Sequence, residues 1–244
     1  MIQLFPQYLE QIREQALQTY PNEAVWVVTT KGLRQLENVH EKPQEHFSIS
    51  PADNAAAFMD GLLAVVHSHV NGLHYPSVHD MQRQVASGVP WGIVMCDGVA
   101  SSKIRWWGGN TAETVEPLYT RTFCHGVTDC YAAVRDFYLV ELGKALPEYP
   151  REWMWWATDA DLIGEGFEAA GFSVVKDQPR PNDVWLAKMR GDKLNHCGVL
   201  LQNDLTYHHP GSDVAVNDSK KAVVEPIYRY LRHVALWVRH KDFQ

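Results

Sequence analysis

The stretch VTDCYAAVRDFYLVELGK, residues 127–144, predicts a helix that anchors the C-terminal half of the chain. Thr128 or Asp129 can cap its N-terminus, and Gly143 is placed to end it. Between them lie apolar residues that can form a buried face: Ala133, Val134, Phe137, Tyr138 and Leu142. The residues around this helix should therefore pack against it.

Downstream, the chain predicts one more helix and then a series of short strands. The helix is expected over 160–170 and is ended by Gly171. The strand candidates are SVV (173–175), DVWLAKM (183–189), CGVLL (197–201), LTYHH (205–209) and HVALWV (233–238). A helix-rich stretch followed by neighbouring strands is typical of an α+β domain with an antiparallel sheet.

Upstream, helices and strands alternate, which predicts a mixed α/β domain. We expect a helix over 2–18, ended by Pro21, and a helix over 51–59 that opens at Ser50-Pro51. A third, exposed helix is expected over 76–87. The expected strands are AVWVVTT (24–30), RQLENV (34–39), HFSI (46–49), LLAVVHSH (62–69), WGIVMC (91–96) and SKIRWW (102–107).

A domain usually has roughly 150 residues. The length of 244 residues therefore fits either one large domain or two small ones. Residues 107–121, WGGNTAETVEPLYTR, contain Gly, Asn, Thr and Pro with little periodicity and are typical of a connector. We therefore expect two domains, 1–113 and 114–244.

Composition limits the classes of function. The chain is 45% hydrophobic and 21% charged, which suits packed cores. Its net charge of -7 argues against a nucleic-acid partner. No apolar stretch approaches the roughly 20 residues of a membrane span, and the first residues, MIQLFPQYLEQIREQ, do not resemble a signal peptide. We expect a soluble, cytoplasmic protein.

Two histidines and an aspartate form the first candidate site. His67 and His69 end an apolar strand, where the two-residue period places both imidazoles on one face. Asp80 follows one short loop later, and two imidazoles with one carboxylate are a common zinc ligand set. Glu23, just before the first strand, is a candidate general base. The alternative is that Ser77 and Asp80 only cap the next helix.

A thiol forms the second candidate site. Cys130 falls in the first turn of the 127–144 helix, where the helix dipole stabilises a thiolate. His196 and His208, each in a strand candidate, could supply a base and an orienting group. The alternative is that Cys130 is a small buried residue.

The remaining cysteines and a tryptophan cluster favour structural roles. Cys96 and Cys124 are expected in the core, and the chain has no CxxC pair. Cys197 follows His196 directly and should point to the opposite face of its strand, which argues against a second metal site built from Cys124, His125, Cys130, His196 and Cys197. Trp153, Trp155 and Trp156 could form a platform for a sugar or peptide, but their spacing favours core packing.

The first site resembles the JAMM (MPN+) metalloprotease motif. The matching pattern is His-x-His, seven residues, Ser, two residues and Asp, with Glu upstream of the first strand. The resemblance implies zinc bound by His67, His69 and Asp80. It also implies Glu23 as general base and Ser77 as a group that holds the oxyanion.

The second half resembles the NlpC/P60 family of cell-wall cysteine peptidases, through GVTDCYAAVRDFY, PNDVWLAKM, NHCGVLL and LTYHHP. The resemblance implies a papain-like α+β fold with Cys130 as nucleophile, His196 as base and His208 as the orienting residue. His209 is the adjacent alternative for the last role. Many members have a tyrosine where this chain has Phe123.

The order of the two motifs resembles the tail assembly protein K family of lambda-like phages and prophages. It implies a hydrolase that cuts amide bonds in peptidoglycan stem peptides and a second, zinc-dependent (iso)peptidase site. The implied partners are stem peptides and other phage tail tip proteins. The implied location is the virion tail tip or the host cytoplasm during assembly. The alternatives are a structural component of the tail tip with weak or no catalysis, and a maturation protease of tail proteins.

Overall fold

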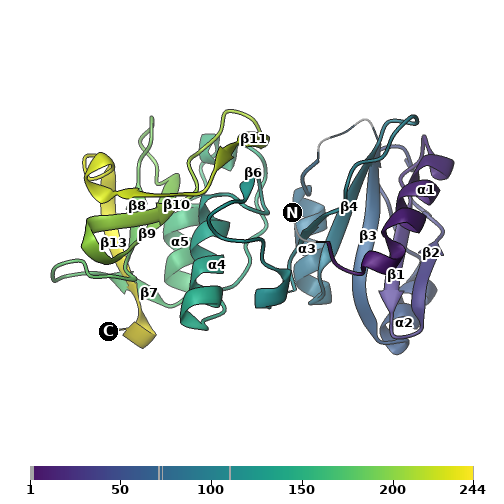
Figure 1. Ribbon diagram of the computed structural model, residues 1–244, viewed down its shortest axis with the longest axis horizontal. Helices are drawn as coiled ribbons and strands as arrows, with labels where there is room; N and C mark the ends of the chain where they lie inside the picture. Colours follow the sequence, from purple (N-terminus) through teal and green to yellow (C-terminus); the bar gives the residue numbers. More distant parts are fainter. Residues whose placement is uncertain (1–2, 71, 73, 110, 244) are drawn as a thin grey trace. The chain divides into compact units, whose positions relative to one another are not determined.

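The computed structural model describes residues 3–70, 72, 74–109 and 111–243. The chain divides into two compact units, Met1–Val115 and Glu116–Gln244, which we call unit 1 and unit 2 (Figure 1). Both units combine helices with a sheet, and the predicted mixture of α/β and α+β architecture is confirmed.

Unit 1 is built on a five-stranded sheet in the order β2-β1-β3-β4-β5. The β3/β4 pair is parallel and the three other pairs are antiparallel. Because a parallel pair needs a crossover connection, α3 lies between β3 and β4 in the chain. The elements are α1 (Leu9–Thr19), β1 (Val25–Thr29), β2 (Gly32–Leu36), α2 (Pro51–Met59), β3 (Leu62–Val70), α3 (Val78–Ser87), β4 (Trp91–Cys96) and β5 (Arg105–Trp107), with short 3-10 helices at Pro6–Tyr8 and Ala112–Thr114.

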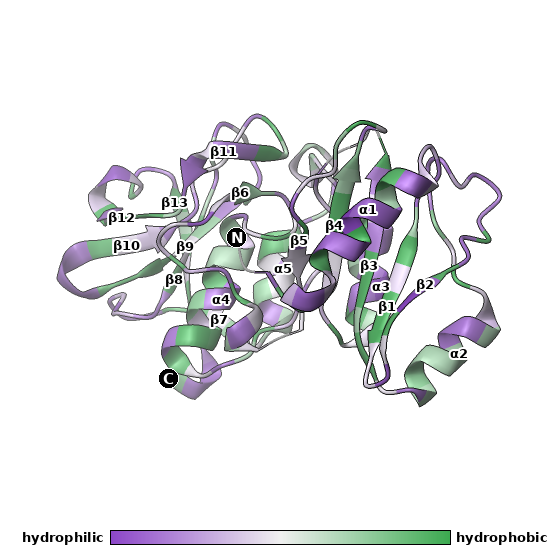
Figure 2. Ribbon diagram, turned by 45° about the vertical axis from the view of Figure 1, so that its right-hand side comes forward, coloured by the Kyte–Doolittle hydropathy of each residue, from purple (hydrophilic) through white to green (hydrophobic). Residues whose placement is uncertain are grey.

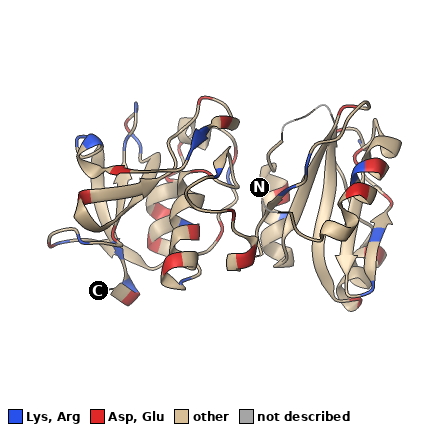
Figure 3. Cartoon of the chain, in the orientation of Figure 1, with Lys and Arg blue, Asp and Glu red and all other residues tan. Residues whose placement is uncertain are grey.

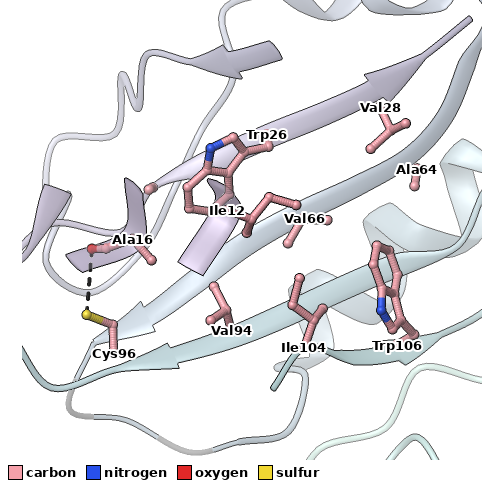
Figure 4. Close-up of a cluster of buried hydrophobic side chains, with 11 residues drawn as sticks. Ile12, Ala16, Trp26, Val28, Ala64, Val66, Val94, Cys96, Ile104 and Trp106 are labelled. Atoms are coloured by element: carbon pink, nitrogen blue, oxygen red, sulfur yellow. Dashed lines mark hydrogen bonds between the residues drawn. The ribbon is translucent and has the colours of Figure 1, made fainter. Parts of the chain in front are cut away.

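One face of this sheet forms the core under α1. Figure 4 shows the buried side chains gathered there, and Figure 2 shows the hydrophobic colour along β3 and β4 while α1 is largely hydrophilic. Ile12 and Ala16 are the buried residues that α1 contributes. The strands contribute Trp26, Val28, Ala64, Val66, Val94, Cys96, Ile104 and Trp106. Burial of this apolar face holds α1 on the sheet.

The alternation of β3 then places the candidate metal ligands. Val66 lies in the core under α1, so its neighbour His67 points to the opposite face, and His69 follows two residues later on that same face. The predicted common face of the two imidazoles is confirmed by a distance of 3.0 Å between their Nε2 atoms.

Two sequence predictions in unit 1 were wrong. The segment 46–49 forms no strand; Phe47 is instead buried through its side chain, with its ring centroid 4.5 Å from that of His67. Helix α3 is not simply exposed, because Asp80, Met81 and Gln84 are buried. The expected start of the first helix at residue 2 lies outside the described residues, and α1 itself begins at Leu9.

Unit 2 is built on a six-stranded sheet in the order β12-β10-β9-β8-β13-β7, and β6 and β11 form a separate pair. Every pair in unit 2 is antiparallel. The elements are β6 (Thr122–Cys124), α4 (Cys130–Leu142), α5 (Leu162–Ala169), β7 (Phe172–Val174), β8 (Val184–Ala187), β9 (His196–Leu200), β10 (Leu205–His208), β11 (Val216–Lys221), β12 (Val223–Pro226) and β13 (Val234–His240). Short 3-10 helices lie at Trp155–Ala157, Gln202–Asp204, Ile227–Arg229 and Lys241–Phe243.

Helix α4 forms where the sequence predicts it and packs against β9 and β10. Asp129 is its N-cap and accepts a hydrogen bond from the N–H of Ala132. Gly143 ends it in the left-handed region, with a φ of 64°. The contact with β9 and β10 brings the first residue of α4, Cys130, to the strands that carry His196 and His208.

Charges are distributed over both units. Figure 3 shows Lys and Arg interspersed with Asp and Glu along each of them. Among the described residues, the structure contains no helix that is long and apolar enough to span a membrane.

Candidate active sites

The candidate metal site of unit 1 brings together the three predicted ligands. The Nε2 atom of His67 lies 3.4 Å from one carboxylate oxygen of Asp80, and the Nε2 atom of His69 lies 3.6 Å from the other. Tetrahedral zinc with bonds of about 2.0–2.1 Å places neighbouring ligand atoms about 3.3 Å apart. The two histidine Nε2 atoms and a carboxylate oxygen of Asp80 lie within 4.8 Å of one another, close enough to hold one metal ion between them.

Asp80 is also part of a helix cap. The Ser77 hydroxyl accepts a hydrogen bond from the Asp80 N–H, and the Asp80 carboxylate accepts one from the Ser77 N–H at 2.8 Å. Ser77 additionally donates its hydroxyl hydrogen to Asp80 Oδ2, at 2.7 Å. The capping and metal-binding interpretations of Asp80 are thus compatible, because the cap fixes the carboxylate that faces the two histidines.

The electrostatics of this site favour a neutral His67 imidazole beside an ionised Asp80 carboxylate. Burial lowers the pKa of His67, against the attraction of Asp80. Burial works to raise the pKa of Asp80, but the charges and hydrogen bonds of His67 and His69 hold it well below its usual range. A neutral imidazole and an ionised carboxylate are the protonation states that bind a metal ion.

Glu23 lies close enough to the site to interact electrostatically with His69 and Asp80. It is buried, and its backbone N–H donates to the carbonyl of Pro43. Burial raises the pKa of Glu23 to about 7, with a further increase from Asp80 and a decrease from His69. A carboxyl group with this pKa can both accept and release a proton near neutral pH.

In unit 2, Cys130 contacts both His196 and Cys197. Hydrogen bonds with the Cys197 thiol and with His196, together with the charge of His196, lower the pKa of Cys130 to about 5, although burial opposes the shift. Cys197 remains a neutral thiol, since burial raises its pKa well above the usual value. The expected alternation of β9 did not predict this contact with Cys197.

His196 and His208 are hydrogen-bonded to one another. The distance between His196 Nε2 and His208 Nδ1 is 3.0 Å, and both side chains are buried. Burial, with the nearby His196 and His209, lowers the pKa of His208 to about 2, so this imidazole is neutral. His209 contacts a different residue: its ring packs edge-on against Phe123, with centroids 5.3 Å apart.

Gly198 makes room for this pair of histidines. A Cβ atom at Gly198 would come within 2.6 Å of the Trp185 ring and 2.7 Å of the His208 Cβ. Trp185 in turn lies against both imidazoles, with centroids 5.3 Å from His196 and 5.5 Å from His208. A side chain at position 198 would therefore displace the groups that position His208.

Asp129, the residue before Cys130, is held by a buried ion pair. Arg151 donates from Nε and Nη2 to the two oxygens of Asp129, at 2.8 and 2.9 Å. Asp129 also accepts from the N–H groups of Gly126 and Ala132. These contacts fix the first turn of α4 and hence Cys130. The sequence analysis identified Asp129 as a cap and did not identify Arg151.

An open cavity of about 1010 Å³ gives access to the thiol. Its lining includes Cys130, His196 and His208, and also Trp153 and Trp156. The predicted core position is correct for Trp155, which is buried, but Trp153 and Trp156 are only partly buried and face the cavity. These two rings lie edge to face with centroids 5.0 Å apart.

Comparison with known proteins identifies both halves of the chain. Residues 105–234, more than half of the chain, match the NlpC/P60 family, and residues 6–108 match the prokaryotic homologs of the JAB domain. The tail tip assembly protein K of Escherichia phage lambda is 36% identical over 163 residues, which cover 66% of this chain and 76% of that protein. The chain belongs to the NlpC/P60 and tail tip assembly protein K families.

A second tail tip assembly protein K, from Escherichia phage N15, is 29% identical over 213 residues, covering 82% of this chain and 83% of that protein. Among solved structures, the NlpC/P60 domain of the peptidoglycan hydrolase SagA covers 50% of this chain and 89% of its own, with 15% identity and a TM-score of 0.34. The JAB-like match precedes the NlpC/P60 match, which is the order that the sequence motifs predicted.

Proposed function

We propose that unit 2 is a cysteine peptidase in which Cys130 is the nucleophile, His196 the base and His208 the residue that orients His196. The observation that carries this proposal is that Cys130, His196 and His208 line the same open cavity, with His196 and His208 joined by a hydrogen bond. The chain's membership of the NlpC/P60 family supports it.

In the proposed reaction, the Cys130 thiolate attacks the carbonyl carbon of an amide bond. His196, protonated when the thiolate forms, gives its proton to the leaving amine as the C–N bond breaks. Water then attacks the resulting thioester, with His196 accepting its proton, and releases the acid product and the free thiol. His208 accepts a hydrogen bond from His196 Nε2 and keeps the imidazole in place throughout.

Stabilisation of the oxyanion falls to the first turn of α4. Phe123 lines the cavity but has no hydroxyl group to donate. The first N–H groups of a helix have no partner within the helix, and Asp129 already accepts from Ala132. We assign the oxyanion to the N–H of Cys130, the first residue of α4.

The proposed substrates are the peptide stems of peptidoglycan. The cavity of about 1010 Å³ can receive a short peptide, and its indole rings offer apolar surface to an extended chain. Similarity to tail tip assembly proteins supports a place in the virion tail tip, or in the host cytoplasm during assembly, with other tail proteins as partners.

Incubation of the purified protein with muropeptides tests this function. We expect wild type to release cleaved stem peptides and Cys130→Ala to release none. Cys96→Ala, which changes a buried cysteine of unit 1, is the matched control and should retain cleavage. Absence of cleavage by wild type, under conditions in which a known stem peptidase works, would overturn the peptidoglycan assignment.

For unit 1 we propose a zinc-dependent (iso)peptidase site held by His67, His69 and Asp80. The closeness of their three ligand atoms, all within 4.8 Å of one another, supports the proposal. Bound zinc would acidify a water molecule and polarise a carbonyl group. Glu23 would accept the proton of that water. Ser77 would donate to the oxyanion, which requires its hydroxyl to turn away from Asp80.

Metal analysis separates the ligand role of Asp80 from its capping role. We expect about one zinc per chain in wild type and a sharp loss in Asp80→Ala. Ser77→Ala is the matched control, because it removes the cap at a cost of about 1 kcal/mol but leaves all three ligands. A wild-type protein refolded with zinc that remains metal-free would contradict the proposal, as would equal losses in both variants.

A role in tail assembly without catalysis is the second candidate, and the similarity to tail tip assembly proteins over 82% of the chain favours it. Two phages, one carrying Cys130→Ala and one carrying His69→Ala, distinguish the catalytic role from the structural role. Normal tails with normal infectivity would favour the structural role. Accumulation of uncut tail proteins in the His69→Ala phage would instead indicate a maturation protease.

A further inference from the structure

The hydrogen bonds that join the two histidines of the thiol site continue beyond His208. The Nε2 atom of His208 lies 3.3 Å from Oε1 of Glu225, on β12. In the β10/β12 pairing, His208 lies opposite Val223 and Thr206 lies opposite Glu225. Glu225 is thus the diagonal neighbour of His208 on the same face of the sheet. Its side chain is 19% exposed.

Glu225 is itself held in place. Tyr230 donates its hydroxyl hydrogen to Oε1 at 2.6 Å, and Arg229 donates to Oε2 at 2.7 Å. The Tyr230 ring stacks on Trp185 at 5.3 Å and contacts the His208 ring at 4.6 Å. Tyr230 therefore contacts both the carboxylate and the imidazole, which fixes their relative orientation.

The protonation state of His208 gives this contact a chemical consequence. A neutral imidazole carries one N–H, which can sit on either nitrogen, whereas an ionised carboxylate can only accept. His208 is buried and neutral. Its contact with Glu225 therefore keeps the hydrogen on Nε2 and leaves Nδ1 as an acceptor toward His196 Nε2.

The tautomer of His208 determines whether His196 can act as a base. When His208 Nδ1 accepts, His196 carries its hydrogen on Nε2, and Nδ1 is the nitrogen left to accept the Cys130 proton. With the other His208 tautomer, an N–H would face His196 Nε2, the His196 hydrogen would move to Nδ1, and this nitrogen could not take the Cys130 proton. On the basis of the proposed peptidase function, we propose that Glu225 is a positioning residue that selects the active tautomer of His208 and, through it, of His196.

Other charged and titratable groups surround these hydrogen bonds. His209 lies beside His208, and Arg229 and Tyr230 face Glu225. Asp129 and Cys197 face Cys130 at the other end. Among the described residues, Glu225 is the carboxylate that contacts His208, so its removal tests the tautomer directly.

The test compares Glu225→Ala and Glu225→Gln with wild type in the full-length protein. Nitrogen NMR of the histidine rings reads the tautomers: we expect the Nε2–H form of His208 in wild type and a mixture in Glu225→Ala. Glu225→Gln should retain the wild-type form, because its amide oxygen can also accept the hydrogen. Val224→Ala, the preceding residue of β12 with an exposed side chain, is the control for damage to the strand.

A second measurement follows alkylation of Cys130 by iodoacetamide against pH, with the modified peptide quantified by mass spectrometry. We expect Glu225→Ala to move the inflection upward by about one pH unit, a tenfold loss of thiolate below it, with no change in Glu225→Gln or Val224→Ala. A purely structural role would lower the melting temperature without moving the inflection. Unchanged tautomers and an unchanged alkylation profile in Glu225→Ala would overturn the proposal.

The two measurements need no peptidase substrate, so they separate this inference from the proposed function. If wild type cuts no muropeptide but Glu225→Ala still shifts both readouts, the peptidase assignment fails and the positioning role stands. If Glu225→Ala does not fold, Glu225→Leu and Glu225→Gln replace it. Leucine cannot accept a hydrogen bond, so equal profiles in these two variants would refute the role of Glu225.

Discussion

The ion pair between Asp129 and Arg151 gives a stability prediction that can be worked out from the contacts. Asp129 is 5% exposed and accepts four hydrogen bonds: one each from Gly126 and Ala132 and two from Arg151. Asp129→Asn keeps the shape of the side chain and one acceptor oxygen. It removes the negative charge and turns an N–H₂ group toward donors that require an acceptor.

We expect Asp129→Asn to lower the free energy of unfolding by about 3 kcal/mol. Breaking a buried ion pair by changing one partner costs about 3–5 kcal/mol, because the other charge is left buried without compensation. We expect the lower end of this energy range for two reasons. Arg151 also donates to Glu148, at 2.8 Å, and asparagine remains a good N-cap. The expected loss is a large part of the roughly 5–15 kcal/mol that stabilises a typical domain.

The assay is a urea titration of unit 2, read by labelling of Cys124, which is buried in the native state. Arg151→Met in the Asp129→Asn background removes the positive charge that Asp129→Asn leaves uncompensated. The double variant should be more stable than the sum of the single effects predicts, by about 2 kcal/mol. A loss below about 1 kcal/mol in Asp129→Asn, or strict additivity in the double variant, would refute the reasoning.

The same ion pair predicts a pH dependence. Burial works to raise the pKa of Asp129, but the charge of Arg151 and the hydrogen bonds it donates hold that pKa well below its usual range. A carboxyl group with a lowered pKa in the folded state contributes stability above its unfolded pKa of about 3.9 and loses it as the pH falls. The difference between wild type and Asp129→Asn should therefore be constant from pH 5 to 8 and shrink below about pH 4.

Three further predictions concern the thiol site. His196→Ala should raise the pKa of Cys130 from about 5 to above 7 and slow its alkylation at pH 7 at least about tenfold, as measured by mass spectrometry of the labelled peptide. Gly198→Ala should lower the unfolding free energy by about 1–3 kcal/mol in a urea titration and abolish cleavage, because the new Cβ meets Trp185 and His208. Trp153→Ala should raise KM for stem peptides at least about threefold with little change in kcat, since its ring lines the cavity away from the reacting atoms.

Local sequence signals predicted the elements that carry the sites. The apolar periodicity of α4, with Asp129 before it and Gly143 after it, depends on neighbours a few residues apart, and the helix forms as predicted. The strand ending in His67 and His69 likewise follows from a two-residue period, which places both Nε2 atoms 3.0 Å apart. Such patterns are visible in a single sequence because the geometry of a helix or strand determines them.

What the sequence did not predict depends on contacts between distant segments. β11 is largely exposed, and its residues, VNDSKK, show no apolar alternation, so only its pairing with β6 makes it a strand. Arg151 reaches Asp129 across 22 positions, and Glu225 reaches His208 across 17. Trp153 and Trp156 line a cavity although their spacing favoured a core, because burial depends on which elements cover them.

The two candidate sites use a carboxylate at a helix N-terminus in different ways. Asp80 caps α3 through contacts with Ser77, and both of its oxygens also lie within 3.6 Å of an imidazole, so the capped carboxylate can still bind a cation. Asp129 caps α4, but Arg151 occupies both of its oxygens. Because the negative charge of Asp129 raises the pKa of Cys130, its neutralisation by Arg151 favours the neighbouring thiolate. The same structural position therefore supplies a proposed metal ligand in unit 1 and a neutralised anchor beside the proposed nucleophile in unit 2.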